Sequence, residues 1–281
     1  MKRTLTYFIA LLTLSAVTAR AQDPTIPQPS PKQTITEEFG LGKITLTYCR
    51  PGVKDRKIFG LTEPYGLVWR TGANNATTIQ FTDEVTIEGR KVPAGEYGLF
   101  SIPGEKEWVF ILNKTPKQWG AYSYKEADDL VRFKVPVTKA PAFTETLTLN
   151  FTEATNSACT LQLDWENTEV KLHLSTDVDA QVMANIDKLM LGEKKPYYFA
   201  SIYYYNHDKD IAKALEWISL RDKEQPNSYN VKYWKARIQL KAGDKAGAIA
   251  TAGEGLKLAQ DENSAEYIRL NQEVITRAHA K

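Results

Sequence analysis

The feature that most constrains this 281-residue chain is a change of hydrophobic period well past its midpoint. From about residue 33 to residue 175, apolar and polar residues alternate, as Ile44, Leu46 and Tyr48 do with the residues between them. Such alternation is typical of antiparallel strands with one buried face. From about residue 176 the apolar residues recur with a helical spacing instead. The sequence therefore predicts an α+β fold, with a jelly-roll-like antiparallel β-sandwich over 33–175 and an all-α domain over 176–281.

Turn signals recur at short intervals in the first of these domains. The clearest pair of strands is Tyr97–Ile102 and Trp108–Leu112, which the turn Pro103–Glu107 joins into a hairpin. Repeated hairpins of this kind are typical of sandwiches and jelly rolls.

The start of the helical domain has its own signal. Thr176 and Asp179 have the spacing of a helix capping box, so we expect a first helix over Val178–Leu191. Asp177 and Asp179 could also be read as a pair of metal ligands, but helix capping explains both residues. We therefore expect no metal site here, and the scattered histidines of the chain suggest none elsewhere.

A degenerate repeat follows the first helix. Ala214 and Ala248 are 34 residues apart, which is the period of the tetratricopeptide repeat. Lys232 and Gln239 stand where that repeat has aromatic residues, so each copy meets only part of the pattern. We expect two tetratricopeptide-like helical hairpins and a last helix, Ser264–Ala278, with an unrelated helical bundle as the alternative. Repeats of this class predict a protein partner.

The first 21 residues have the pattern of a signal peptide. Lys2 and Arg3 precede a short apolar run, Leu5–Val17, and Ala19 and Ala21 have the spacing that signal peptidase cuts. The apolar run is shorter than a membrane-spanning helix requires, so we expect no stable membrane anchor. The mature protein is predicted to be exported, to the periplasm or the medium, after cleavage near Ala21.

Charge excludes one class of partner. The full chain has 36 basic and 34 acidic residues, but Lys2, Arg3 and Arg20 belong to the signal peptide, which leaves 33 against 34. Residues 22–32 are a polar, proline-rich lead-in rather than a basic arm. Without an excess or a run of positive charge, a nucleic-acid partner is not expected.

The chain has two cysteines, Cys49 and Cys159, both in predicted strands. Export makes a disulfide between them feasible. The alternative is two unpaired small hydrophobic residues, and the sequence does not decide between them. Neither cysteine has a histidine close in sequence, which disfavours a thiol nucleophile.

Polar and aromatic residues gather in two segments of the β-domain. Arginine forks, asparagine amides and flat aromatic rings together suit a small polar, anionic or glycan-like ligand. The candidate ligand-binding residues in these segments are Arg50, Arg56, Trp69, Arg70, Asn74, Asn75, Trp119, Tyr122, Asp129 and Arg132. The alternative is structural: these arginines could pair with Asp128, Asp129 or Glu63 and fasten loops across the sandwich.

Motifs for known chemistries are missing from the sequence. It contains no G-x-S-x-G, S-x-x-K, H-E-x-x-H, C-x-x-C or P-loop, and no cofactor is expected. If the protein is an enzyme, we expect a hydrolase or lyase acting on carbohydrate or peptidoglycan fragments. Asp129 would then be the acid/base, and Arg70 would stabilise developing negative charge.

Several segments of the β-domain match a known pattern. They include Tyr48-Cys49-Arg50-Pro51, the Trp-Arg-Thr-Gly-Ala-Asn run of residues 69–74, and Pro93–Phe100. In these segments the chain resembles the bacterial domain-of-unknown-function 2911 family, common in exported proteins of Bacteroidetes, over about residues 30–175. Cys49 departs from the family, which usually has serine there. The resemblance implies a bounded exported domain and assigns no activity, so the leading hypothesis is a non-catalytic binding or scaffold protein.

Overall fold

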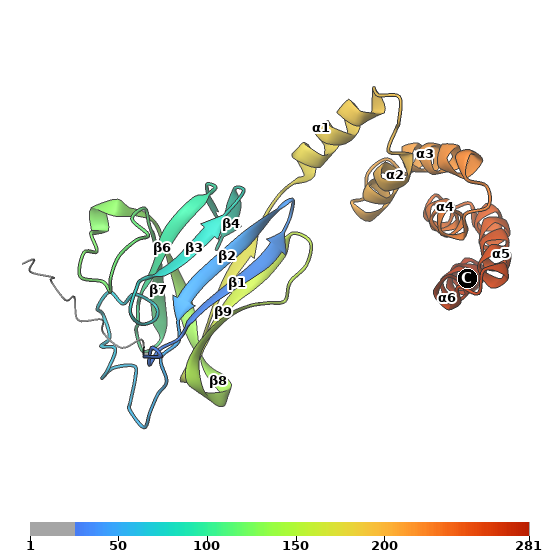
Figure 1. The fold of residues 1–281 in the computed structure, drawn as a ribbon. Coiled ribbons are helices and arrows are strands. Elements are labelled where there is room, and N and C mark those ends of the chain that lie inside the picture. The colour runs from blue at the N-terminus through green and yellow to red at the C-terminus, as the bar shows by residue number, and fades with distance from the viewer. Residues whose placement is uncertain (1–25, 281) are drawn as a thin grey trace, which may run out of the picture. The chain divides into compact units, whose positions relative to one another are not determined.

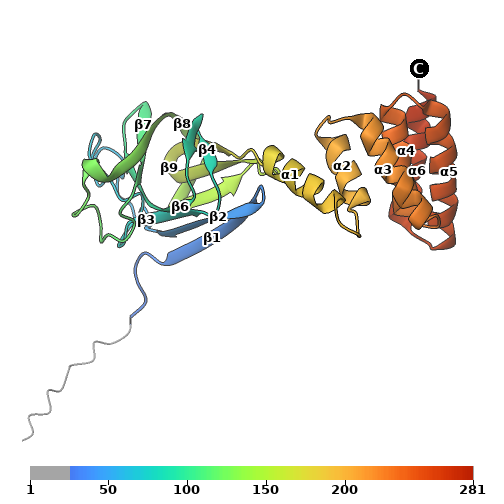
Figure 2. The ribbon, with the colours of Figure 1, turned by 90° about the horizontal axis from the view of Figure 1, so that it is seen from above.

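The computed structural model describes residues 26–280, which divide into two compact units (Figures 1 and 2). The β-unit ends at Thr176, and the helical unit begins at Asp177. An antiparallel β-domain followed by an all-helical part confirms the predicted α+β fold class. The predicted signal peptide lies outside the described residues. Within the described residues, no helix has both the length and the apolar character needed to cross a membrane.

The described part of the β-unit contains nine strands in one antiparallel sheet, ordered β1-β2-β3-β6-β7-β8-β9-β4-β5. Most strands that pair in the sheet are also consecutive in the chain. The exception is the β4–β5 hairpin, which follows β3 in the chain but pairs with β9, so that β3 pairs with β6. The strands are β1 (Lys32–Phe39), β2 (Gly42–Cys49), β3 (Thr77–Phe81), β4 (Val85–Ile87), β5 (Arg90–Val92), β6 (Gly95–Ile102), β7 (Glu107–Asn113), β8 (Asp129–Thr152) and β9 (Ala158–Ser175); a 3₁₀ turn, η1 (Glu126–Asp128), precedes β8. The predicted hairpin is therefore β6–β7.

Strand β8 is unusually long, at 24 residues, and it joins two halves of the sheet. Its first part, Asp129–Pro136, pairs with β7, and the remainder pairs with β9 through two shifts of register. The sheet curves so that its two halves face each other (Figure 1). Tyr48 on β2 spans the interior: its hydroxyl donates to the carbonyl of Leu149 on β8 at 3.0 Å and accepts from the Leu149 amide at 2.9 Å.

The core between the two halves follows from the alternation in the sequence. Ile44, Leu46 and Tyr48 are at most 1% exposed and pack in one cluster with inward side chains of β8 and β9. The core contains four large aromatic residues in mutual contact. Phe59 and Trp108 meet edge to face with ring centroids 4.8 Å apart, and the Trp69 and Trp165 rings stack at 5.8 Å.

Both cysteines are buried free thiols. The structure therefore answers the question that the sequence left open. Burial, together with the nearby carboxylate of Glu37, raises the pKa of Cys159 to about 11. A thiol that holds its proton so firmly is a poor nucleophile at neutral pH.

The helical unit contains six helices in the described residues. They are α1 (Asp179–Met190), α2 (Tyr197–Asn206), α3 (Ile211–Glu224), α4 (Tyr229–Lys241), α5 (Lys245–Asp261) and α6 (Ala265–His279). The α2–α3 and α4–α5 hairpins and the final α6 confirm the predicted repeats. Ala214 and Ala248, which defined the period, are fully buried.

One departure from the repeat pattern has a local explanation in the structure. Buried Lys232 replaces an aromatic residue and forms ion pairs with Asp222 at 3.0 Å and Glu254 at 2.7 Å. The predicted capping box at the start of α1 does not form: the cap residue is Val178, without a side-chain hydrogen bond, and the Thr176 hydroxyl donates to the Glu84 carbonyl at 3.3 Å instead. The carboxylate of Asp177 accepts a hydrogen bond from the Asp179 amide at 3.0 Å. The helix begins one residue later than predicted.

Candidate recognition site

The two segments that the sequence singled out lie side by side in the β-unit. The backbone amide of Ala76 donates to the Gln118 carbonyl at 2.9 Å, and the Gly120 amide donates to the Asn74 carbonyl at 2.9 Å. Asn75 and Trp119 form an antiparallel bridge between these two contacts. The loop after β2 and the loop after β7 are therefore joined by their backbones.

Trp69 fixes the first of these loops to the sheet. Its backbone exchanges hydrogen bonds of 2.7 and 2.8 Å with Ser101 on β6, and its indole Nε1 donates to the Gly72 carbonyl at 3.0 Å. The side chain is only 4% exposed, inside the aromatic core cluster. Trp69 thus anchors the loop and does not offer the exposed ring face that the sequence suggested.

Arg50 and Arg56 also hold the loop in place. Arg50 donates to the Leu147 carbonyl at 3.1 Å and to the Thr148 hydroxyl at 2.9 Å. Arg56 donates to the carbonyls of Val53 at 2.9 Å and Gly52 at 2.7 Å. The structural alternative is therefore the better description of both, although their partners are carbonyl and hydroxyl oxygens and not the carboxylates expected.

Asp129 and Arg132 belong to a closed network. One oxygen of Asp129 accepts from Asn113 at 2.9 Å, and the other accepts from the Tyr124 hydroxyl at 2.7 Å and Arg132 Nε at 2.8 Å. Arg132 also contacts Glu126 at 3.2 Å. Burial, followed by the hydrogen bond to Asp129, raises the pKa of Tyr124 to about 12. Both Asp129 oxygens are occupied and its side chain is 9% exposed, so it is poorly placed to exchange a proton with a ligand.

Arg70 has different surroundings. A Cβ built on Gly120, whose φ is +67°, would lie 3.4 Å from Arg70 Nη1 and 2.7 Å from the ring of Tyr122. The guanidinium and the ring therefore flank the same backbone position. Trp119 and Tyr122 are 62% and 84% exposed, and Asn75 is exposed beside them. We call Arg70, Asn75, Trp119, Gly120 and Tyr122 the Arg70 patch.

The guanidinium of Arg70 makes no hydrogen bond or ion pair with a described residue. Its Nε is buried and has no hydrogen-bond partner among the described residues. Asn74, in contrast, serves the turn: its φ is +58°, and its side-chain amide lies 3.4 Å from the Ser30 carbonyl. Of the ten candidate residues, Arg70, Asn75, Trp119 and Tyr122 form the open surface, and the other six hold the fold.

Glu63 is a residue of this region that the sequence suggested only as an arginine partner. Burial raises the pKa of its carboxyl from 4.5 to about 7, and the positive charges of Arg70 and Arg56 offset that rise only in part. The carboxyl has no hydrogen bond or ion pair with any described residue. The only signal in the sequence was the position of Glu63 between two arginines of the loop. The burial that raises its pKa depends on the fold and could not be read from the sequence.

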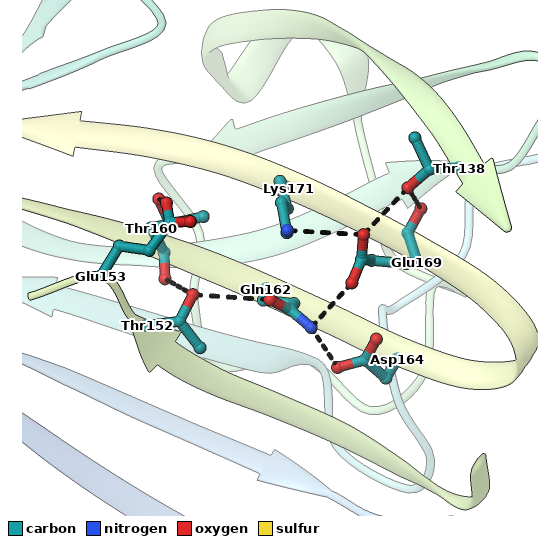
Figure 3. Close-up of polar contacts among 8 residues, drawn as sticks. All are labelled: Thr138, Thr152, Glu153, Thr160, Gln162, Asp164, Glu169 and Lys171. Atoms are coloured by element: carbon teal, nitrogen blue, oxygen red, sulfur yellow. Dashed lines mark hydrogen bonds and ion pairs between the residues drawn. The ribbon is translucent and has the colours of Figure 1, made fainter. Parts of the chain in front are cut away.

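A further polar cluster, which the sequence did not indicate, lies on β8 and β9 (Figure 3). The amide of Gln162 donates to Asp164 at 2.8 Å and to Glu169 at 3.0 Å, and Lys171 pairs with Glu169 at 3.4 Å. Burial and the neighbouring Glu169 charge raise the pKa of Asp164, while the Gln162 hydrogen bond opposes the rise. These four residues all lie on β9. The cluster reaches β8 through Thr138, whose hydroxyl donates to Glu169 at 3.1 Å, and Thr152, whose hydroxyl lies 3.5 Å from Gln162 Oε1.

The fold and the site define a class of protein in which joined loops of a curved antiparallel sheet carry exposed aromatic rings beside a half-buried arginine, followed by helical repeats. A family model described as protein of unknown function (DUF2911) matches residues 30–174, and the chain belongs to that family. No curated protein and no solved structure matches the chain. The family region covers the β-unit and both loops of the site, so the resemblance seen in the sequence is confirmed.

Proposed function

We propose that this protein is an exported, non-catalytic recognition protein whose β-unit binds a small polar or glycan-like ligand at the Arg70 patch. The observation that carries the proposal is the pair of exposed rings, Trp119 and Tyr122, beside an arginine with a buried and unpartnered Nε. Elsewhere in the β-unit, most large aromatic residues of the sheet fill the core, and Phe143 on β8 is an exposed exception. Exposed rings on a hydrogen-bonded loop serve no comparable packing role.

The chemistry of the patch favours a ligand with both flat and polar faces. Aromatic rings present apolar faces against which a sugar ring can stack. Arg70 supplies forked donors for hydroxyl or carboxylate oxygens, and the exposed amide of Asn75 can donate and accept. The backbone bonds that join the loops hold these groups in place before binding, which reduces the entropy lost on association.

The helical unit is proposed to bind a partner protein. A cavity of about 240 Å³ lies along α2, α4 and α6. Arg237 on α4 donates to the hydroxyls of Tyr233 at 3.1 Å and Tyr205 at 3.2 Å, and its guanidinium lies over both rings. Aromatic residues and arginine are the types most enriched among residues that dominate protein interfaces.

Calorimetric titration of the mature chain with oligosaccharides and peptidoglycan fragments tests the β-unit proposal. Trp119→Ala should weaken binding about tenfold, because a stacked ring of this kind contributes on the order of 1–2 kcal/mol. Phe143→Ala is the matched control, because Phe143 is 56% exposed and lies outside the patch. Equal affinity of the two variants for a bound ligand would place the site elsewhere.

A hydrolase or lyase is the second candidate, and one observation favours it. A carboxyl with a pKa of about 7, such as Glu63, is suited to exchange protons at neutral pH. The acid/base role would then pass from Asp129 to Glu63, with Arg70 stabilising negative charge. Release of reducing ends from the same fragments, abolished in Glu63→Gln and retained in Asp129→Asn, would support catalysis. No release by the wild-type chain would leave recognition alone.

A further inference from the structure

A second cavity of the helical unit lies away from the α2–α4–α6 groove. Its volume is about 480 Å³, within the range of ligand pockets in proteins. It is open to solvent and formed by the segment before α2, the start of α2, the end of α3 and the start of α4. We call it the Phe199 pocket; its principal lining residues are Lys194, Lys195, Tyr198, Phe199, Arg221 and Val231.

The walls of the Phe199 pocket are largely apolar. Phe199 is 75% exposed, although its neighbour Ala200 on α2 is buried in the helical core. The rings of Tyr198 and Phe199 meet edge to face with centroids 5.3 Å apart, and Val231 is buried next to them. An exposed phenylalanine at the mouth of an apolar cavity is a typical anchor point for an incoming side chain.

The charged residues that line this cavity are all positive. Lys194, Lys195 and Arg221 line it, and none of its lining residues is acidic. Neither lysine forms an ion pair with a described residue. Arg221 Nη1 pairs with Glu224 at 3.0 Å, while its Nε is buried without a hydrogen-bond partner. Arg221 Nη2 is not buried and makes no hydrogen bond with a described residue, so it is the group that can donate to an arriving acceptor.

We propose that the Phe199 pocket binds an acidic segment of a partner protein, with an apolar side chain in the cavity and carboxylates at Arg221 and the two lysines. The inference rests on the proposed partner-binding role of the helical unit and gives that role a location and a partner chemistry. Positive charge selects acidic groups, and the apolar wall selects an aliphatic or aromatic anchor. The open side leaves room for the chain of the segment to enter and leave.

The test is fluorescence anisotropy of the mature chain with a short labelled peptide that carries aspartates on both sides of a Leu-Phe pair. Phe199→Ala should weaken binding about tenfold or more, as for a residue at the centre of an interface. Arg221→Gln should weaken binding several-fold and reduce its sensitivity to salt. The controls are Phe143→Ala and Arg269→Gln, because Phe143 is exposed outside the helical unit and Arg269 lies outside the pocket.

The same assay separates the possible outcomes. The peptide with asparagines in place of its aspartates should bind more weakly, and equal binding would overturn the proposal. If Arg237→Gln abolishes binding while Phe199→Ala leaves it unchanged, the partner-binding role stands but the Phe199 pocket is the wrong site. If the wild-type chain does not bind the peptide but sediments with vesicles rich in anionic lipid, the pocket binds a lipid surface and the proposal is wrong. Because Phe199 is exposed, its replacement should leave the fold intact, which circular dichroism verifies.

Discussion

Arg132 and Arg70 have the same side chain and lie in the same β-unit, but their surroundings are opposite. The guanidinium of Arg132 meets Asp129, Tyr124 and Glu126 within 3.2 Å. Arg70 has a buried Nε without a hydrogen-bond partner among the described residues, and its Nη1 lies beside the exposed ring of Tyr122. The charge of Arg132 is compensated by its neighbours, whereas Arg70 keeps hydrogen-bond donors that a ligand can use.

The difference shows what separates a structural arginine from one available for recognition. A buried charge is tolerated when its partners complete its hydrogen bonds, and then little free energy remains for a ligand. An incompletely bonded donor leaves the protein less stable, and a ligand that supplies the acceptor recovers that free energy. Both regions contain an arginine, an asparagine and a tyrosine, but the Arg132 network also contains two carboxylates that complete the bonding of the arginine.

Removing Asp129 should have the largest effect, because it leaves Arg132 and Tyr124 without their shared acceptor. We expect Asp129→Ala to lower the free energy of unfolding by about 3 kcal/mol, measured by urea denaturation. Glu126→Ala is the control: Glu126 is 76% exposed, and the loss should be below about 0.5 kcal/mol. A similar small loss for Asp129→Ala would show that the network is not closed in solution.

Glu63 lies near Arg70, and its protonation should make stability depend on pH. A carboxylate closed onto an arginine has a lowered pKa, but burial raises that of Glu63 from 4.5 to about 7. The folded state therefore holds this proton more tightly than the unfolded state does. The resulting stabilisation is complete below about pH 4.5 and is lost as pH rises to about 7.

The protonated carboxyl of Glu63 should contribute on the order of 2 kcal/mol to the free energy of unfolding, a value reduced to allow for its partial exposure. Glu63→Gln should remove that part of the pH dependence and be more stable than the wild type above pH 7. Urea denaturation at about pH 5 and about pH 8 measures the difference between the two chains. Parallel stability profiles would mean that Glu63 is ionised normally and that Arg70 is paired after all.

Replacing Gly120 should have a smaller effect on stability, and Gly89 provides a matched control. Gly120 and Gly89 both have a positive φ, +67° and +76°, so alanine at either position should destabilise the fold by about 1 kcal/mol. A Cβ at Gly120 also meets the Tyr122 ring at 2.7 Å, whereas a Cβ at Gly89 has nothing within 4 Å. Only Gly120→Ala should therefore weaken ligand binding at the Arg70 patch, as measured by calorimetry. Equal binding by both variants would separate Tyr122 from the site.

The smallest effect on stability should come from Tyr122 itself. Its side chain is 84% exposed, so Tyr122→Ala should change the free energy of unfolding by less than about 0.5 kcal/mol. Thermal unfolding followed by circular dichroism checks this. A large loss would mean that Tyr122 packs against the loop as Tyr124 does, and the contrast between the two regions would fail.

Much of the fold could be predicted because short-range periodicity reports burial directly. The alternation around Leu46 and the spacing of Ala214 and Ala248 identified the strands and the repeats, since each pattern is fixed by local geometry. The strand order could not be predicted in this way. An alternating segment such as Val85–Ile87 shows which face is buried but not which partner its backbone finds, and here the partner is the distant β9.

The candidate site was predicted in part for a similar reason. The sequence placed the polar residues in two segments, but it could not show that Arg50 would bond to a carbonyl while Arg70 would keep an unpartnered donor. Nor could it show that Trp69 is buried and Trp119 exposed, since both are tryptophans in loops rich in glycine and polar residues. These distinctions depend on contacts between segments far apart in the chain.

The long strand β8 also affects how the β-unit comes apart. It is hydrogen-bonded to β7 along its first part and to β9 along the remainder, and Tyr48 links its far end back to β2. Neither half of the sheet can therefore separate without breaking hydrogen bonds between strands of the two halves. Amide hydrogens in β2, β7 and β9 should then exchange with solvent through the same global unfolding event, and the β-unit should melt as a single cooperative body.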